Sequence, residues 1–176
     1  MYSHRDAVTG LDLLVRPPLF SETVLWREKS THIMVSGSWD ATVKVWSVTI
    51  ANGETVSINR EPLAELFDAD SSIVCVSAVA ADGGGIVIGT GCADGSFCIW
   101  NLHSDGVKVV IHKEPARRGS GPCSVLKWSS EGGKQTLFAG FATGKVASYT
   151  LSDGQIRRAS AASVGVAVST LYCDSG

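Results

Sequence analysis

The chain has 176 residues, with 15 Lys and Arg against 17 Asp and Glu, so its formal net charge is −2. This length suits one domain with a buried core. The balanced charge argues against a nucleic-acid or anionic-membrane surface over the whole domain, although it does not exclude a local basic patch. Charged residues make up only 18% of the chain and glycine occupies 19 positions, which is typical of short strands joined by tight turns.

The cysteine pattern favours a reducing, cytoplasmic setting. The number of cysteines is odd and no two have Cys-x-x-Cys spacing, so neither a disulfide framework nor a zinc site is predicted. No apolar run approaches 18 residues, and the first ten residues lack a charged segment followed by an apolar one. Neither a membrane span nor a signal peptide is therefore expected. The five cysteines are Cys75, Cys92, Cys98, Cys123 and Cys173.

The predicted elements follow one repeating order along the chain. Each unit begins with a spaced apolar triplet suited to a buried inner strand, continues through a strand–turn–strand segment and ends in a short outer strand. The first unit has a loop over 15–31 that resembles an insertion. Residues 164–173 are predicted to form the inner strand of a fourth unit. Helical periodicity is almost absent, so the fold class is all-β. The triplets are Val8, Leu11 and Leu13; Ile73, Val76 and Ala78; and Cys123, Leu126 and Trp128. The central segments are 35–46, 88–100 and 138–149, and the outer strands are 63–67, 107–112 and 155–158.

The central segments share a polar pattern. In the first two segments an Asp lies six residues before a Trp, and a hydroxyl residue lies four residues before that Asp. Tyr149 takes the Trp position in the third copy, which is weaker. The matching positions are Ser36, Asp40 and Trp46 in the first copy, and Thr90, Asp94 and Trp100 in the second.

This pattern resembles the WD40 repeat, which implies a β-propeller of four-stranded blades. The resemblance implies a hydrogen-bonded structural tetrad of His4, Ser36, Asp40 and Trp46. The second unit keeps its three matching residues, but Asp68-Ala69-Asp70 stands where the family has Gly-His. The third unit has no His in place. The whole chain, 1–176, is interpreted as a single propeller fragment, with blades at about 3–67, 68–112 and 113–160 and a partial fourth at 161–176.

Residues 3–102 more closely resemble the C-terminal propeller of BEACH–WD40 proteins. The resemblance rests on His4-Arg5-Asp6-Ala7-Val8 together with the segment 36–46. It implies an adaptor in membrane trafficking or signalling, in the cytoplasm and peripheral to endomembranes. Because WD40 rings usually have seven blades, the remaining blades are expected from the same chain or from a second copy.

Trp39 is the leading candidate for contact with a partner. It directly precedes the turn residue Asp40, so it is expected on the face formed by the connecting loops, bordered by Arg5, Asp6 and Asp70. An exposed Trp on a rigid face is a typical interface anchor. The alternative is that its indole folds back over its own blade. Burial of Trp26 cannot be decided from the sequence, and the remaining tryptophans, Trp46, Trp100 and Trp128, are predicted to be core residues rather than a stacking platform for nucleic acid.

A second candidate site is the loop Ala116-Arg117-Arg118-Gly119. It resembles the Phe/Leu-Arg-Arg-Gly motif of phosphoinositide-binding propellers, which implies that Arg117 and Arg118 contact headgroup phosphates. The alternative is an ordinary solvated basic loop. An Arg-Arg-x-Ser pattern also makes Ser120 and Ser160 candidate phosphorylation sites.

No catalytic, metal or cofactor site is predicted. The glycine-rich segment 89–95 precedes a strand rather than a helix, so it does not match a phosphate-binding loop. No His has metal-ligand spacing, and the Ser and Cys residues lack a base and an orienting acid. The sequence therefore predicts a non-catalytic scaffold that binds proteins or peptides and no nucleic acid. The alternatives are a phosphoinositide-binding propeller and a regulatory subunit of a larger enzyme complex.

Overall fold

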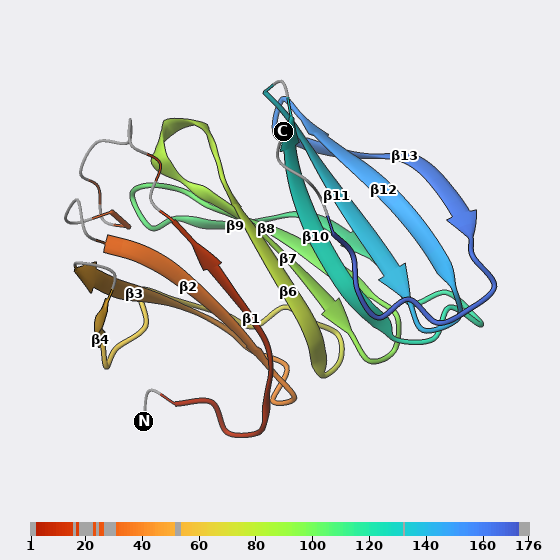
Figure 1. The fold of residues 1–176 in the computed structure, drawn as a ribbon, viewed down its shortest axis with the longest axis horizontal. Coiled ribbons are helices and arrows are strands. Elements are labelled where there is room, and N and C mark those ends of the chain that lie inside the picture. The colour runs from red at the N-terminus through yellow and green to blue at the C-terminus, as the bar shows by residue number, and fades with distance from the viewer. Residues whose placement is uncertain are drawn as a thin grey trace.

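The computed structural model describes residues 3–15, 17, 23, 25–26, 31–51, 54–131 and 133–172. These residues form three antiparallel sheets that stand side by side, with one 3₁₀ turn at Asp82–Gly84 (Figure 1). The all-β prediction is therefore confirmed. The first sheet contains β1 (Val8–Leu14), β2 (Thr31–Ser38), β3 (Val43–Ala51), β4 (Glu54–Ile58) and β5 (Ala64–Leu66). The second contains β6 (Ile73–Ala80), β7 (Ile86–Cys92), β8 (Phe97–Leu102) and β9 (Lys108–Glu114). The third contains β10 (Cys123–Glu131), β11 (Lys134–Phe141), β12 (Lys145–Ser152) and β13 (Gln155–Ser163).

Each sheet runs in sequence order from an inner strand to an outer one, as the repeat predicts. The second and third sheets have the orders β6-β7-β8-β9 and β10-β11-β12-β13. In the first sheet the outer edge is divided, because β4 pairs with the far end of β3 and β5 pairs with its beginning. The outer strands predicted at 63–67, 107–112 and 155–158 correspond to β5, β9 and β13. The sequence pattern did not indicate β4.

The three sheets share one register, which makes their residues directly comparable. Each inner strand has a bulge just after its first residue, at Val8, Ile73 and Cys123. Each hairpin turn between the second and third strands is held by an N–H that donates to the loop preceding the inner strand. These hydrogen bonds run from Trp39 to Ala7 (3.0 Å), from Ala93 to Ser72 (2.9 Å) and from Ala142 to Pro122 (3.0 Å).

Close approach of the sheets depends on glycine at two positions in particular. A Cβ on Gly10 of β1 would lie 2.9 Å from the backbone nitrogen of Val76. A Cβ on Gly91 of β7 would lie 2.6 Å from Cys75 Sγ and 2.8 Å from Cys123 Sγ. Because real Cβ atoms do not approach other atoms this closely, a side chain at either position would push neighbouring strands apart.

The core consists of two layers, one between each pair of neighbouring sheets. Trp26, whose burial the sequence left open, is fully buried in the first layer, and its indole N–H donates to the Gly84 carbonyl at 2.9 Å. Leu25 is buried beside it. The described part of the loop that resembles an insertion therefore contributes to packing against the end of the second sheet.

The predicted burial of the first inner strand is wrong. Val8, Leu11 and Leu13 are 50%, 63% and 47% exposed. Their counterparts in the second sheet include Ile73 and Val76, which are buried because the first sheet packs against them. Among the described residues no sheet covers the corresponding face of β1, so its apolar side chains face solvent (Figure 1).

The predicted inner strand at 164–173 is also not observed as a strand. Its described part, 164–172, has no strand pairing, and Cys173 lies outside the described residues. The segment instead lies along the third sheet, where Val164 N–H donates to the Gly144 carbonyl at 2.8 Å. Ser124 Oγ donates to the Val168 carbonyl, just as Thr9 Oγ1 donates to the Ile73 carbonyl at 2.6 Å. Val168 thus occupies the position at which the preceding inner strands begin.

Candidate interaction face

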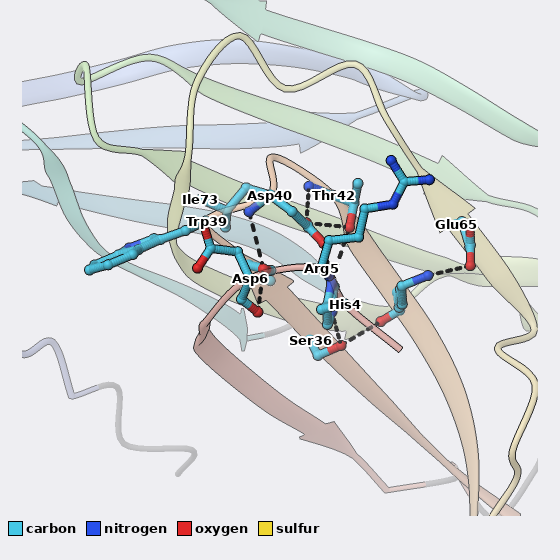
Figure 2. Close-up of polar contacts among 12 residues, drawn as sticks. His4, Arg5, Asp6, Ser36, Trp39, Asp40, Thr42, Glu65 and Ile73 are labelled. Carbon is cyan, nitrogen blue, oxygen red and sulfur yellow. Dashed lines mark hydrogen bonds and ion pairs between the residues drawn. The ribbon is translucent and has the colours of Figure 1, made fainter. Parts of the chain in front are cut away.

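The structure brings His4, Ser36, Asp40 and Trp46 into one polar cluster. Figure 2 shows the first three of these residues. The Trp46 indole N–H donates to Ser36 Oγ at 2.8 Å, and His4 Nε2 lies 2.8 Å from the same oxygen. His4 Nδ1 lies 3.0 Å from Thr42 Oγ1 and 3.3 Å from Asp40 Oδ2. With Nδ1 protonated, the Ser36 hydroxyl can donate to Nε2 while Nδ1–H donates to the carboxylate. Every buried polar atom of the cluster then has a partner.

Asp40 fixes the turn between β2 and β3. Its Oδ2 accepts the Arg5 N–H at 2.7 Å, and its Oδ1 accepts the Thr42 N–H at 2.9 Å and the Thr42 hydroxyl at 2.6 Å. Burial by itself raises the pKa of Asp40, but the hydrogen bonds from Thr42 and Arg5 outweigh it and lower the pKa to about 2. The same bonds hold Ala41 at a φ of 62°, which favours glycine and which the surrounding contacts must therefore stabilise.

The second unit does not assemble such a cluster. Asp94 Oδ1 accepts the N–H and the hydroxyl of Ser96, at 2.9 and 2.6 Å, so the turn is built as in the first sheet. Thr90, however, donates to the Cys98 carbonyl at 3.3 Å, and the buried indole nitrogen of Trp100 has no hydrogen-bond partner among the described residues. The predicted tetrad of the second unit is therefore not joined, because the His position is taken by an alanine, Ala69.

The tryptophans predicted to be core residues are not equally buried. Trp100 and Trp128 are 2% and 5% exposed. Trp46 is only partly buried, because its face of the first sheet is not covered by another sheet among the described residues.

The sequence analysis also missed the role of Thr42 in binding Asp40. The signal for it was present, since a hydroxyl two residues after a turn Asp is a common way to close such a turn. Lys44, which is buried and pairs with Glu65, carried no comparable signal.

Trp39 projects away from the polar cluster that holds its own turn (Figure 2). Its side chain is 54% exposed, so the indole does not fold back over its own sheet. Its backbone is fixed at both ends, because its N–H donates to the Ala7 carbonyl and its carbonyl accepts the Ser72 hydroxyl at 3.0 Å. Asp6, in the loop that precedes β1, is exposed beside Trp39 (Figure 2). Arg5, predicted to border the same face, is also exposed, but its side chain extends away from Trp39 and past Thr42 (Figure 2). We call Trp39 and Asp6 the Trp39 face.

Asp70, predicted to border this face, is engaged elsewhere. Its carboxylate lies 2.6 Å from Lys113 Nζ on β9. The hydrogen bond that Lys113 donates to Asp70 raises the pKa of Lys113. Asp70 therefore ties a connecting loop to the outer strand of its own sheet.

The basic loop between β9 and β10 is partly neutralised. Arg117 pairs with Glu114, whereas Arg118 is exposed and forms no ion pair with a described residue. Ser120 is buried and its hydroxyl donates to the Arg117 carbonyl, so a kinase would reach it only if this loop opened. Ser160 is exposed on β13, with its Oγ 2.7 Å from that of Ser148.

Within the described parts of the chain, His, Cys, Asp and Glu side chains form no group of three that could hold a metal ion. None of the helical segments in that same part of the chain is long and apolar enough to span a membrane. Four of the five cysteines are described, and all four are free thiols. Burial raises the pKa of the Cys98 thiol to about 12, which keeps it protonated and unreactive at neutral pH.

The three sheets and their shared register define a partial WD40 β-propeller. No protein-family model matches the chain. Its structure is similar to that of Sqt1 from Saccharomyces cerevisiae, with a TM-score of 0.63 and 15% identity over 95% of this chain and 38% of that one. Two structures of Sqt1 from Chaetomium thermophilum have TM-scores of 0.56 and 0.54, with 19% and 20% identity, each over 85% of this chain and 32% of theirs. The chain thus spans about a third of the length of these structures, and at this identity the similarity concerns the fold.

Proposed function

We propose that this chain is a non-catalytic scaffold that binds other proteins through the Trp39 face. The observation that carries the proposal is the 54% exposure of an indole whose backbone is fixed by hydrogen bonds on both sides. An indole has few rotatable bonds and its backbone is already fixed here, so it loses little entropy on binding. Trp is also enriched among residues that dominate interface energies. The neighbouring carboxylate of Asp6 would add a polar contact beside this anchor.

The finer assignment is to a BEACH–WD40 protein with a role in membrane trafficking or signalling, in the cytoplasm and peripheral to endomembranes. The resemblance of residues 3–102 supports it. A regulatory subunit of a larger enzyme complex would use the same face, and only the identity of the partner separates these two roles.

The test is quantitative capture of partners from cells that express the tagged chain, with Trp39→Ala compared with the parent. Val107→Ala is the matched control, because Val107 is 53% exposed and lies in the turn between β8 and β9, at the other end of the strands. We expect at least one protein to be lost at least fivefold with Trp39→Ala and retained with Val107→Ala. Equal recovery with both variants would exclude the Trp39 face as the binding surface.

A second candidate function is binding of a phosphoinositide headgroup by Arg117 and Arg118. The exposed guanidinium of Arg118, which forms no ion pair with a described residue, favours it, whereas the ion pair between Arg117 and Glu114 opposes it. Flotation with vesicles that contain phosphoinositides separates the two functions. Binding that is lost in Arg117→Ala/Arg118→Ala would support the lipid function, and no binding above phosphatidylcholine vesicles would exclude it.

A further inference from the structure

A cavity of about 430 Å³ lies between the outer strands of the second and third sheets. One wall is a face of the third sheet, on which the register places Tyr149 opposite Arg158 and Ala147 opposite Ala161. The other wall comes from the end of β9 and the loop that follows it. The hollow exists because the two alanines are too small to reach across the space between the sheets.

At the corresponding position, the second sheet carries a long charged side chain that is held in an ion pair. Ala161 of β13 and Lys113 of β9 occupy equivalent positions in their sheets. Ala161 pairs with Ala147 of β12, and Lys113 pairs with Cys98 at the equivalent position of β8. The Lys113 side chain extends to Asp70, with Nζ 2.6 Å from the carboxylate. The repeat thus provides an internal comparison: β9 has an ion-paired lysine where β13 has an alanine.

The open cavity is lined with more positive than negative charge. Three cations, Arg117, Lys145 and Arg158, contribute to its lining, against the single carboxylate of Glu114, which pairs with Arg117. Arg158 forms no ion pair with a described residue. Among the described residues, Lys145 Nζ donates only to a backbone carbonyl, that of Gly119, at 3.3 Å. The net charge of the lining is therefore about +2, since three cations oppose one carboxylate.

The floor of the cavity offers both apolar contact and a hydroxyl. Tyr149 is 2% exposed, its ring packs edge-on against Phe97 with centroids 4.9 Å apart, and its hydroxyl forms no hydrogen bond with a described residue. Burial raises the pKa of Tyr149, with a further contribution from Glu114, so the phenol stays protonated and can donate. Cations, a phenol donor and small apolar side chains therefore converge on one hollow.

We propose that this cavity binds the phosphorylated side chain of an extended segment of a protein partner. A phosphoserine carries a charge of about −2 and three acceptor oxygens, which match the charge of the lining and its guanidinium, ammonium and phenol donors. The cavity volume is within the usual range for ligand pockets. A lipid headgroup with several phosphates would carry more negative charge than the lining, at about +2, can neutralise. β13 is the outer strand of its sheet and lines the cavity, so its backbone is available to an extended chain. The inference adds a partner chemistry to the proposed scaffold and rests on that proposed function.

The test measures binding of the full chain to a peptide library with a central phosphoserine and randomised flanks, against the same library with serine. We expect binding of the phosphorylated library only. It should fall at least tenfold in Arg158→Gln and in Ala161→Leu, which fills the cavity without changing its charge. Arg157→Gln is the matched control, because Arg157 pairs with Thr150 and its side chain is on the opposite face of β13. Thermal unfolding of each variant should match that of the parent.

Equal binding of both libraries, absence of binding, or unchanged binding in Arg158→Gln would overturn the proposal. So would binding to phosphoinositide vesicles without binding to phosphopeptides, which would assign the cavity to a membrane. Trp39→Ala should leave phosphopeptide binding intact. Failure of the cavity site can therefore be distinguished from failure of the Trp39 face. Loss of cellular partners in Trp39→Ala without phosphopeptide binding would disprove the cavity site alone. Phosphopeptide binding without any effect of Trp39→Ala would disprove the Trp39 face alone.

Discussion

Ser36 joins the polar cluster of the first sheet, because its Oγ contacts both His4 Nε2 and the Trp46 indole N–H. The role of this residue and of Asp40 was implied by the resemblance to the WD40 repeat, in which a hydroxyl and a carboxylate stand at fixed distances before a Trp. The absence of such a hydrogen-bonded cluster from the second unit was less predictable. The sequence shows that Asp68-Ala69-Asp70 stands at the Gly-His position. Only the structure shows that Thr90 then bonds to a backbone carbonyl and that the Trp100 indole nitrogen has no hydrogen-bond partner among the described residues.

Ser36→Ala should therefore destabilise the fold more than Thr90→Val. The first change leaves a buried imidazole nitrogen and an indole N–H without their partner, which costs about 2–3 kcal/mol. The second removes one hydrogen bond to a carbonyl, worth about 1 kcal/mol. Urea unfolding of the two variants and the parent measures the difference. Equal losses would show that the cluster adds nothing beyond a single hydrogen bond.

The lowered pKa of Asp40 makes stability depend on acid pH. Its pKa is about 2 in the folded chain against 3.8 for the unperturbed group, so the ionised carboxylate stabilises the fold above about pH 4. That contribution is lost as the pH falls from about 4 to 2, because the unfolded chain takes up the proton first.

Asp40→Asn removes this titration. Between pH 5 and pH 2 the free energy of unfolding of the parent should fall by about 1–2 kcal/mol more than that of Asp40→Asn. Urea titrations at a series of pH values provide the comparison, and the other carboxylates cancel because both proteins contain them. Parallel pH profiles would contradict the assigned hydrogen bonds.

At the scale of elements, alternation and turn signals were sufficient to place most of the strands, including the outer strands at β9 and β13. They were insufficient where packing between distant parts of the chain decides which residues pair and which are buried. β4 pairs with a short part of β3, and Leu25 and Trp26 belong to the core although they lie in a stretch without periodicity. The burial of a strand face also depends on a neighbouring sheet, which is why the first apolar triplet was placed wrongly.

Gly91 lies at a tight contact between the second sheet and the third. Gly91→Ala would place a Cβ within 3 Å of two cysteine sulfurs and of the Cys123 carbonyl oxygen. We expect it to lower the free energy of unfolding by about 1–3 kcal/mol through overpacking. Gly89→Ala is the control, because its nearest contacts would be ordinary ones of 3.4–3.5 Å. Thermal and urea unfolding measure both, and an equal effect would mean that the sheets are more loosely packed than described.

At the scale of the whole molecule, the exposed face of β1 is the feature that most needs a neighbour. Val8, Leu11 and Leu13 form an apolar surface whose counterparts in the second and third sheets are mostly buried. We propose that a further sheet, from the same polypeptide or from a second copy, covers it, since contiguous apolar patches usually mark contact surfaces.

The isolated chain should therefore self-associate through β1. Leu11→Glu should shift its mass in light scattering toward that of a monomer, because it places a charge in the contact. Val109→Glu, on the outer strand β9 and 42% exposed in the parent, should have no such effect. A chain that is monomeric at every concentration, with or without Leu11→Glu, would exclude pairing through this face.

The central claim is that the Trp39 face contacts a protein partner, and photo-cross-linking from that face with Trp39 left in place tests it most directly. Benzoylphenylalanine would replace Asp6 in one version of the chain and Val107 in another, and both would be irradiated in cells. The proposed scaffold predicts a discrete cross-linked product with a protein from position 6 and none from position 107. Absence of a product from position 6, or the same products from both positions, would contradict it.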